Sequence, residues 1–243
     1  MQLETNPDAD WVVELAGVPR ARAGRALREA AGAHGLYRYL EREHDAEGRD
    51  SYIEIDAPLE LHALVRLGRP RHVLEIGVSS GVSSAYLLDA LERNGRGTLH
   101  SIDLPAPPRR TRTGAATRAS WSLPEGRSSG WAVPFRLRKR WDLRLGDKAE
   151  VIPLLASELP QIDLVVYDVP HRDRDLRREL RILQPRLGPH AVVIVDHGPG
   201  GEACSALRAW ARENRGRLTG RTGLGLYGAR RRARPPEPSK GRR

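Results

Sequence analysis

From about residue 57 onward, two patterns of apolar residues alternate along the chain. Short β-branched runs predict strands, and the stretches between them carry apolar residues three or four positions apart, which predicts helices. The run 162–167 is almost continuously apolar, as expected for a central strand covered on both faces. Strands that alternate with helices in this way indicate βαβ units and a parallel sheet.

The same pattern places the individual elements. Strands are expected at 72–76, 98–102, 143–145, 162–167 and 191–195, and a C-terminal hairpin at 218–228. Helices are expected at 82–93, 173–183 and 202–213. The predicted fold class is therefore α/β, with a doubly wound, mostly parallel sheet that ends in an antiparallel hairpin.

Two regions depart from this rhythm. Before the core, residues 21–43 and 58–67 are expected to be helical and to form a lid over the ligand-binding side. Residues 104–140 contain five prolines together with Trp121 and Trp131, and such a long insertion is usually functional or disordered. The two tryptophans indicate a binding surface, or alternatively attach the loop to the body. We divide the chain into a helical extension (1–54), a main domain (55–229) with this inserted loop, and a tail (230–243).

Composition narrows the class of protein. With 30% charged and 39% hydrophobic residues the chain is expected to be globular and soluble, and no apolar run is long enough to cross a membrane. Of the net charge of +10, +6 lies in residues 230–243, which we expect to be a disordered, solvated tail rather than a specific nucleic-acid site. The single cysteine, Cys204, excludes an internal disulfide and a zinc cluster built from cysteines. No apolar leader is evident at the N-terminus, and a cytoplasmic location is expected.

A glycine loop after the first strand carries the strongest chemical signal. Gly77 and Gly81 let the backbone turn sharply and approach a ligand, and the helix that follows offers unpaired N–H groups. Ser79 and Ser80 add hydroxyl groups and a candidate N-cap. The Gly-x-x-x-Gly spacing differs from the Gly-x-Gly-x-x-Gly of dinucleotide-binding folds, which disfavours a nicotinamide dehydrogenase.

Acidic residues follow the next two strands. Asp103 ends the second strand, where a carboxylate can accept hydrogen bonds from both ribose hydroxyls of a nucleoside ligand. Asp147 follows the third strand, where it can meet an adenine amine or serve as the N-cap of a helix that begins at Lys148. A nucleoside-containing ligand is thus expected.

A second group of polar residues follows the fourth and fifth strands. Asp168, Asp196 and His197 are expected to converge at adjacent strand ends as ligands for Mg²⁺ or another divalent ion, or to act through hydrogen bonds. His171 is a candidate general base, or a loop histidine bonded to a carboxylate. His190 is expected to point away from this crevice. The charged run from Arg172 to Arg181 is expected to be a solvated helix face.

Taken in order, these motifs resemble a known family. They are Val73-Leu74-Glu75-Ile76-Gly77-Val78-Ser79-Ser80-Gly81-Val82-Ser83-Ser84, Ser101-Ile102-Asp103-Leu104-Pro105, Gly130-Trp131-Ala132-Val133-Pro134, Leu145-Gly146-Asp147, Ile162-Asp163-Leu164-Val165-Val166-Tyr167-Asp168 with His171, and Val192-Val193-Ile194-Val195-Asp196. Over roughly residues 55–228 the set resembles the Methyltransferase-24 group of class I methyltransferases, which is related to the catechol and macrocin O-methyltransferases.

The resemblance implies a seven-stranded Rossmann-like sheet that binds S-adenosylmethionine. The implied cofactor residues are Glu75, Gly77, Ser79, Ser80, Gly81, Asp103, Asp147 and Asp168. In metal-dependent relatives the counterparts of Asp168, Asp196 and His197 bind a divalent cation. Relatives commonly carry Tyr-Glu where this chain has Asp173-Arg174, and Asp or Asn at the position of His197.

The function expected is methylation of a small-molecule hydroxyl, with His171 and Asp168 as catalytic residues. Alternatives are methylation of RNA or protein, with the tail and the inserted loop as docking surfaces, and a noncatalytic module that binds S-adenosylmethionine. No membrane partner is expected, and the sequence is compatible with a homo-oligomer.

Overall fold

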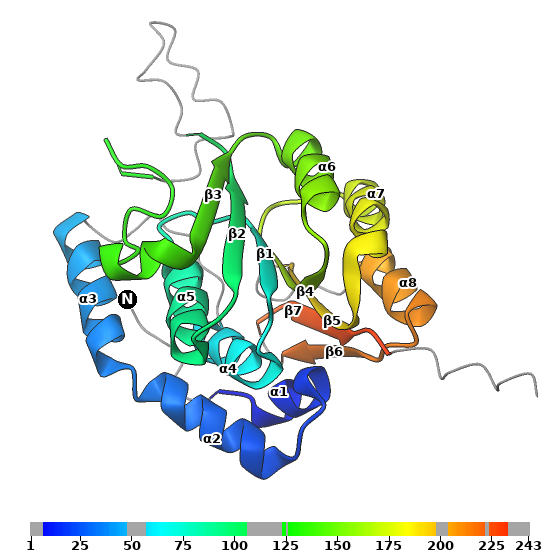
Figure 1. Cartoon of the computed structure of the whole chain (residues 1–243), viewed down its shortest axis with the longest axis horizontal. Helices are drawn as coiled ribbons and strands as arrows, with labels where there is room; N and C mark the ends of the chain where they lie inside the picture. The colour runs from blue at the N-terminus through cyan, green and yellow to red at the C-terminus, as the bar shows by residue number, and fades with distance from the viewer. Residues whose placement is uncertain are drawn as a thin grey trace, which may run out of the picture.

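A seven-stranded sheet organises the chain (Figure 1). The computed structural model describes residues 7–47, 57–105, 123–124, 126–197, 204–221 and 224–232. Within these residues the strands run in the order β3-β2-β1-β4-β5-β7-β6. Their bounds are β1 His72–Ile76, β2 Thr98–Asp103, β3 Trp141–Leu145, β4 Ile162–Tyr167, β5 Leu187–Asp196, β6 Leu218–Arg221 and β7 Leu226–Arg230. Strands β1 to β5 pair in parallel and β7 is antiparallel to β5 and β6, which confirms the predicted fold class.

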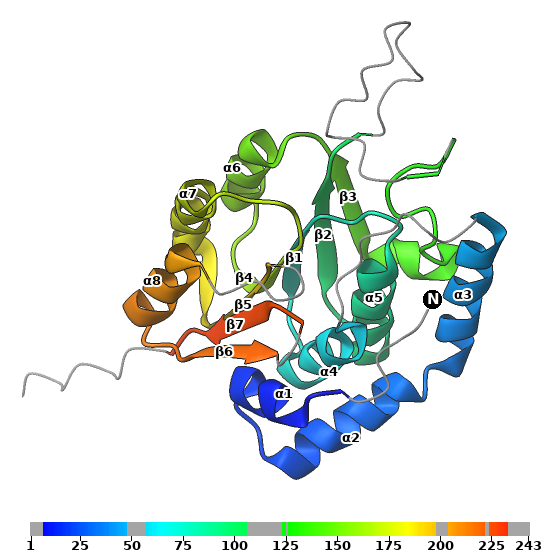
Figure 2. The same cartoon turned by 180° about the vertical axis from the view of Figure 1, so that it is seen from behind.

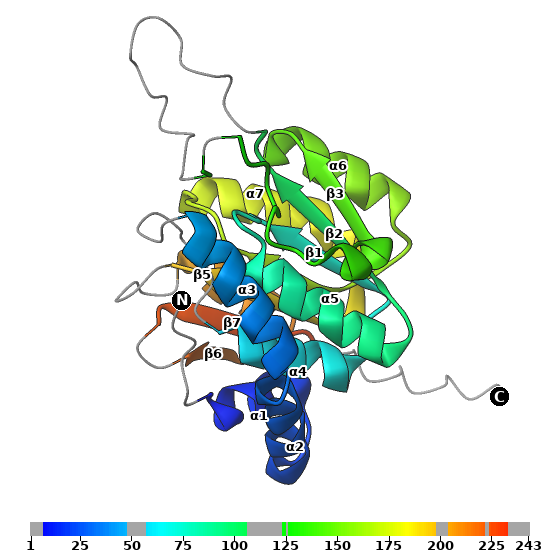
Figure 3. The same cartoon turned by 90° about the vertical axis from the view of Figure 1, so that its left-hand side faces the viewer.

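Helices cover both faces of this sheet (Figures 1 and 3). The helices are α1 Ala9–Ala16, α2 Arg20–Ala31, α3 His34–Glu47, α4 Pro58–Gly68, α5 Val82–Asn94, α6 Lys148–Glu158, α7 Asp173–Leu183 and α8 Ser205–Glu213. Side chains of neighbouring strand residues alternate between two separate apolar cores. Val73 packs with α1 to α5, whereas Leu74 packs with α6, α7 and α8. This double burial explains why the parallel strands read as nearly continuous apolar runs.

The first helix packs against the last strands. Sequence analysis missed α1, an eight-residue helix whose side chains Trp11, Val12 and Leu15 are buried. Asp8 caps it by accepting hydrogen bonds from two backbone N–H groups, and the indole Nε1 of Trp11 donates to the carbonyl oxygen of Thr219 on β6 at 3.4 Å. Residues far apart in the sequence are thereby joined at one edge of the sheet (Figure 2).

The predicted helix 21–43 is two helices. α2 ends at Ala31 and α3 begins at His34, with Gly32 and Ala33 between them. α2 packs on α4, whereas α3 lies along α5 and brings its C-terminal half to the glycine loop (Figure 3). Of the helices predicted as a lid, α3 is thus the one that reaches this loop.

Two other boundaries differ from expectation. β5 begins at Leu187 and β7 ends at Arg230, so the first residue of the predicted tail belongs to the sheet. Residues 233–243 lie outside the described residues, as does Trp121 in the inserted loop. The later part of that loop forms a 3-10 helix, Phe135–Arg140, and Trp131 is 8% exposed within the core, which favours attachment of this tryptophan to the body.

Among the described residues, no helix is both long and apolar enough to span a bilayer.

Candidate functional site

The strand order reverses between β1 and β4. From β1 the sheet continues to β2 and β3 on one side and to β4 and β5 on the other, and open α/β sheets bind ligands at the carboxyl ends of the strands at such a switch point. The strand ends lie in direct contact here, since the N–H of Asp168 donates to the carbonyl oxygen of Ile76 at 2.8 Å. A Cβ atom on Gly77 would lie 2.0 Å from the carbonyl oxygen of Asp168, so only glycine fits at this position.

A second segment of the chain forms backbone hydrogen bonds with the glycine loop. The N–H of Gly130 donates to the carbonyl oxygen of Ser79 at 2.8 Å, and that of Ala132 donates to the carbonyl oxygen of Ser80 at 3.0 Å. Ser79 adopts a positive φ of 50°, and its Oγ is buried without a hydrogen-bond partner. A buried hydroxyl without a partner can form a hydrogen bond with a polar atom of a ligand.

The cap of α5 differs from the prediction. We expected Ser79 or Ser80 to cap this helix, but the N-cap residue is Gly81, at φ 95°, and it makes no side-chain capping hydrogen bond. Glycine is favoured because a Cβ atom there would lie 2.6 Å from Cγ2 of Val133 and would strain a positive φ. The uncapped N-terminus leaves backbone N–H groups and the positive end of the helix dipole for a ligand.

A histidine that sequence analysis missed supports the loop from outside. The Nδ1–H of His44 donates to the carbonyl oxygen of Leu40 at 2.7 Å, so its Nε2 accepts from the hydroxyl of Ser80 at 3.0 Å. The ring also packs on Trp131, with centroids 5.1 Å apart. Burial lowers the pKa of His44, which keeps the ring neutral and able to accept at neutral pH. Since His44 and Ser80 are 36 residues apart, no local pattern signals this contact.

Glu75 is buried next to the glycine loop, and its contact with a cofactor stays a prediction. Its carboxylate is fully buried and accepts hydrogen bonds from the hydroxyls of three serines at 2.6 to 2.9 Å, namely Ser83, Ser84 and Ser101. Burial raises the pKa of Glu75 to about 7, against the opposing effect of these hydrogen bonds. In this arrangement Glu75 connects β1 to β2 and to the first turn of α5, and so positions the loop.

The two acidic residues expected at a nucleoside lie at neighbouring strand ends. Asp103 ends β2, and its Oδ2 accepts from the N–H of Ser79 at 3.0 Å, which places this carboxylate beside the glycine loop. Asp147 is exposed after β3 and is the N-cap of α6, where its Oδ1 accepts from the N–H of Ala149 at 2.8 Å. The capping role considered for Asp147 is therefore present, and contact with an adenine stays a prediction.

The residues at the ends of β4 and β5 are not grouped as expected. Asp168 follows β4 and Asp196 ends β5, whereas His197 is grouped with His171 and Cys204. Among the described residues, the group that brings one candidate metal-ligating atom of each member within 4.8 Å of the others is His171, His197 and Cys204. The predicted set of Asp168, Asp196 and His197 does not form such a group among the described residues, and its role as a metal site stays a prediction.

His171 occupies the loop between β4 and α7. Its Nδ1–H donates to the carbonyl oxygen of Val169 at 2.9 Å, which leaves the lone pair on Nε2. Its ring lies edge-on to those of Tyr167 and His197, with centroids 5.2 and 5.0 Å away. Burial, together with His171, lowers the pKa of His197 to about 4, so His197 is neutral at pH 7.

The charged run on α7 is only partly solvated. Glu179 is 5% exposed and accepts from the Nζ of Lys148 at 2.5 Å, contrary to our prediction for this residue. The reason is its helical position, since Leu176 and Leu180 place Glu179 on the side facing the core. Asp173 accepts from the N–H of Ala206 at 2.7 Å and from the hydroxyl of Ser205 at 2.5 Å, which fastens α7 to the start of α8.

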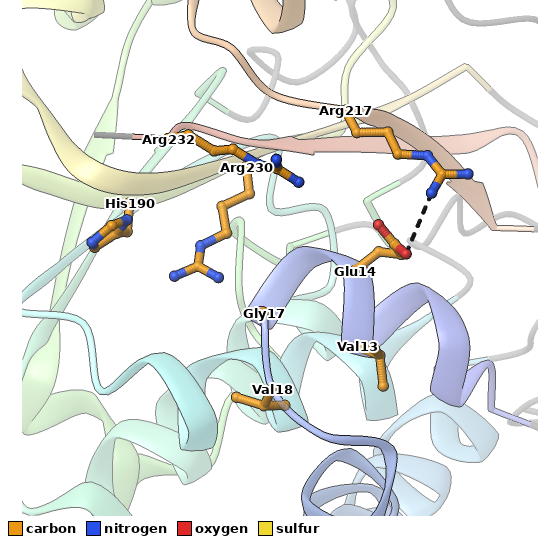
Figure 4. Close-up of a pocket in the computed structure, with 8 residues that line it drawn as sticks. All are labelled: Val13, Glu14, Gly17, Val18, His190, Arg217, Arg230 and Arg232. Carbon is orange, nitrogen blue, oxygen red and sulfur yellow. Dashed lines mark hydrogen bonds and ion pairs between the residues drawn. The ribbon is translucent and has the colours of Figure 1, made fainter. Parts of the chain in front are cut away.

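A separate basic pocket lies between α1 and the sheet (Figure 4). It has a volume of about 470 Å³ and is lined by Val13, Glu14, Gly17, Val18, His190, Arg217, Arg230 and Arg232. Arg230 donates to the carbonyl oxygen of Ala16, and Arg217 pairs with Glu14 at 3.5 Å. These contacts tie the end of α1 to the sheet. His190 lies here, away from the carboxyl ends of the strands, as expected.

Comparison with known proteins shows the family. A methyltransferase-domain family, Methyltransferase-24, matches residues 74–197, which are just over half of the chain. The chain belongs to this family. The matched residues of this methyltransferase-domain protein include the glycine loop, Asp103 and the polar residues after β4 and β5. No curated protein matches it in sequence.

Solved structures share the fold of this methyltransferase-domain protein. The O-methyltransferase TomG from Streptomyces achromogenes, solved with S-adenosylmethionine, is 19% identical with a TM-score of 0.51, and the match covers 82% of this chain and 89% of TomG. A methyltransferase from Geobacter sulfurreducens is 16% identical with a TM-score of 0.52, covering 85% and 96%. An O-methyltransferase from Bacillus cereus, in complex with S-adenosylhomocysteine, is 14% identical with a TM-score of 0.50, covering 81% and 90%.

Proposed function

We propose that this methyltransferase-domain protein transfers the methyl group of S-adenosylmethionine to a hydroxyl oxygen of a small molecule. The observation that carries the proposal is the glycine loop, open at the uncapped N-terminus of α5 and adjoined by the Asp103 carboxylate. The likeness to O-methyltransferases that bind the same cofactor or its product supports it.

The described residues fit this cofactor. Asp103 would accept hydrogen bonds from the ribose hydroxyls, and the buried Oγ of Ser79 offers a polar contact that the protein itself does not use. Gly77 and Gly81 would let the ligand approach the backbone, while Asp147 would lie near the adenine. Glu75 would act indirectly by holding the loop. When bound, the cofactor supplies an electrophilic methyl group for an in-line displacement.

The acceptor would lie over the carboxyl ends of β4 and β5. The available Nε2 of His171 would take the proton from the acceptor hydroxyl, and Asp168 would help to orient the reacting groups. Positioning donor and acceptor supplies most of the acceleration in such a transfer. The edge-on packing of His171 against Tyr167 and His197 fixes the plane of this base.

Calorimetric titration tests cofactor binding directly. S-adenosylmethionine and S-adenosylhomocysteine are expected to bind, and NAD is not, because of the glycine spacing. Asp103→Ala is expected to weaken binding of the adenosyl ligands by about tenfold or more, since each lost hydrogen bond to a charged group corresponds to about 1.5–3 kcal/mol. Asp10→Ala, an exposed change on α1, is the matched control and should bind as the unchanged chain does.

Three results would each overturn a different part of the proposal, namely the cofactor, the catalysis or the class of acceptor. Failure of both adenosyl ligands to bind would remove the cofactor, and binding without turnover against a panel of phenolic and sugar hydroxyls would favour a noncatalytic module. A steep salt dependence of turnover on RNA would instead favour a nucleic-acid acceptor. The same titrations in the presence of Mg²⁺ test the predicted metal site of Asp168, Asp196 and His197. We expect Mg²⁺ to leave the affinity for the adenosyl ligands unchanged.

A further inference from the structure

Three side chains from separate segments meet beside the candidate site. His171 comes from the loop after β4, His197 follows β5, and Cys204 precedes α8. One candidate ligand atom of each lies within 4.8 Å of the others. Ligands around a tetrahedral zinc ion lie about 3.4–3.7 Å apart, given metal–ligand distances of about 2.0–2.3 Å. We call these three residues the His-His-Cys cluster. Shifts of about 1 Å in the ligand atoms, through small side-chain rotations, would let all three bind one ion.

The two imidazoles are already prepared to act as ligands. His171 donates its Nδ1–H to the carbonyl oxygen of Val169, and metal-binding histidines commonly fix their second nitrogen in this way. The Nε2 of His197 is buried and has no hydrogen-bond partner. Burial of a nitrogen without a hydrogen-bond partner is unfavourable, and a bound metal ion would remove this cost.

The cysteine is held in place by well-packed helices. Cys204 is the N-cap of α8 but makes no side-chain capping bond, so its sulfur is not used by the helix. Helices α7 and α8 lie side by side (Figure 1). Asp173 fastens the start of α8 to α7, because it accepts hydrogen bonds from the N–H of Ala206 and the hydroxyl of Ser205. Asp173 thus supports the position of Cys204 relative to both histidines.

We propose that the His-His-Cys cluster of His171, His197 and Cys204 is a binding site for Zn²⁺. Two imidazoles and a thiolate are a donor set that suits zinc, whereas Mg²⁺ prefers oxygen ligands. Three protein ligands leave a fourth position for water or another oxygen donor. This site differs from the set of Asp168, Asp196 and His197 expected from the sequence, and the proposal does not depend on the proposed methyl transfer.

The site has a consequence for His171. A nitrogen that ligates a metal cannot accept a proton, so zinc binding and general-base action exclude each other at its Nε2. The proposed function describes the metal-free enzyme, and zinc binding is measured without turnover. The two proposals can therefore fail separately.

The single cysteine makes a direct test possible. Alkylation of the full chain, prepared without a polyhistidine tag, reports on Cys204 alone. One equivalent of Zn²⁺ is expected to slow alkylation at least tenfold, EDTA to restore the rate, and millimolar Mg²⁺ to have no effect. Co²⁺ is expected to give the ligand-field bands of a tetrahedral site together with a thiolate charge-transfer band.

Variants separate the cluster from incidental binding. Cys204→Ser keeps a good N-cap for α8 and should abolish the charge-transfer band, and His197→Asn should weaken Zn²⁺ binding at least tenfold by dialysis and elemental analysis. His190→Asn, at an exposed histidine in the basic pocket, is the matched control and should bind as the unchanged chain does. Unchanged alkylation in Zn²⁺, equal protection by Mg²⁺, or full Zn²⁺ affinity in His197→Asn would overturn the proposal.

Discussion

At the scale of single residues, Glu75 shows how a carboxyl group is accommodated inside a core. Its carboxylate is enclosed by three serine hydroxyls, which are small donors that β2 and the first turn of α5 supply. Burial nevertheless raises the pKa of Glu75 to about 7. The folded protein therefore holds a proton at this site in a range where the unfolded chain, with an ordinary value near 4.5, does not.

This shift predicts a pH dependence of stability. Because the folded pKa is raised, the contribution of Glu75 is fully present below pH 4.5 and is lost as the pH rises to about 7. A shift of this size corresponds to on the order of 3 kcal/mol. Glu75→Gln removes the titration, so the difference in unfolding free energy between the unchanged chain and the variant should fall between pH 5 and pH 8. Urea unfolding at both pH values measures it, and a constant difference would contradict the shift.

Residues of the site differ in how far the sequence predicts them. Asp103 and Gly77 follow from their position after a strand, because strand ends converge at one edge of a parallel sheet. His44 could not be predicted, since its contact with Ser80 depends on how α3 lies along α5. The grouping of Cys204 with His171 and His197 could not be predicted for a similar reason. Sequence places His197 next to Asp196, but the side chain packs toward His171 and Tyr227 instead.

At the scale of elements, strands and core helices were the most predictable parts. The bounds of β1, β4 and α7 match the expected ranges, because each combines a clear period with a strong stop signal. Where signals conflict, prediction failed. The alanine-rich stretch around Gly32 favours helix and hid the break between α2 and α3. The sequence Gly188-Pro189-His190 interrupted the apolar run and hid the first half of β5.

The start of α5 carries the sharpest prediction at this scale. Gly81→Ala would force a side chain into a positive φ and bring its Cβ 2.9 Å from the Cα atom of Gly130. We expect a loss of about 1–3 kcal/mol in unfolding free energy and weaker binding of S-adenosylhomocysteine. Gly35→Ala, on the exposed face of α3 with no atom within 4 Å of the added Cβ, is the control and should gain about 0.5–1 kcal/mol. Equal stability of both variants would contradict the strain argument.

At the scale of the whole molecule, a buried ion pair joins the two ends of the domain. The Oε1 of Glu60 on α4 lies 2.9 Å from the Nε of Arg221 on β6, and both side chains are less than 10% exposed. Glu60 also accepts from the N–H of Asp8, which precedes α1. One carboxylate thus connects three segments that are distant in sequence.

Removal of one partner of this ion pair should therefore lower the unfolding free energy. Glu60→Ala is expected to lower the unfolding free energy by about 3–5 kcal/mol, because it leaves a guanidinium buried without this carboxylate. The double variant with Arg221→Ala should lose less than the sum of the single losses, and chemical unfolding of all four proteins measures this coupling. Additive losses would show that the pair does not act as a unit.

The packing of α1 against β6 also sets an order of events during synthesis. Trp11 and its partner Thr219 are 208 residues apart, and at about 5–20 residues per second a ribosome needs roughly 10–40 s to make the chain between them. Throughout that interval α1 can pack on α2 and α4, but it lacks the part of its final surface that β6 and β7 supply. The contacts of α1 with β6 and β7 can form only after these strands are made, so an early segment of the chain docks onto a much later one near the end of folding.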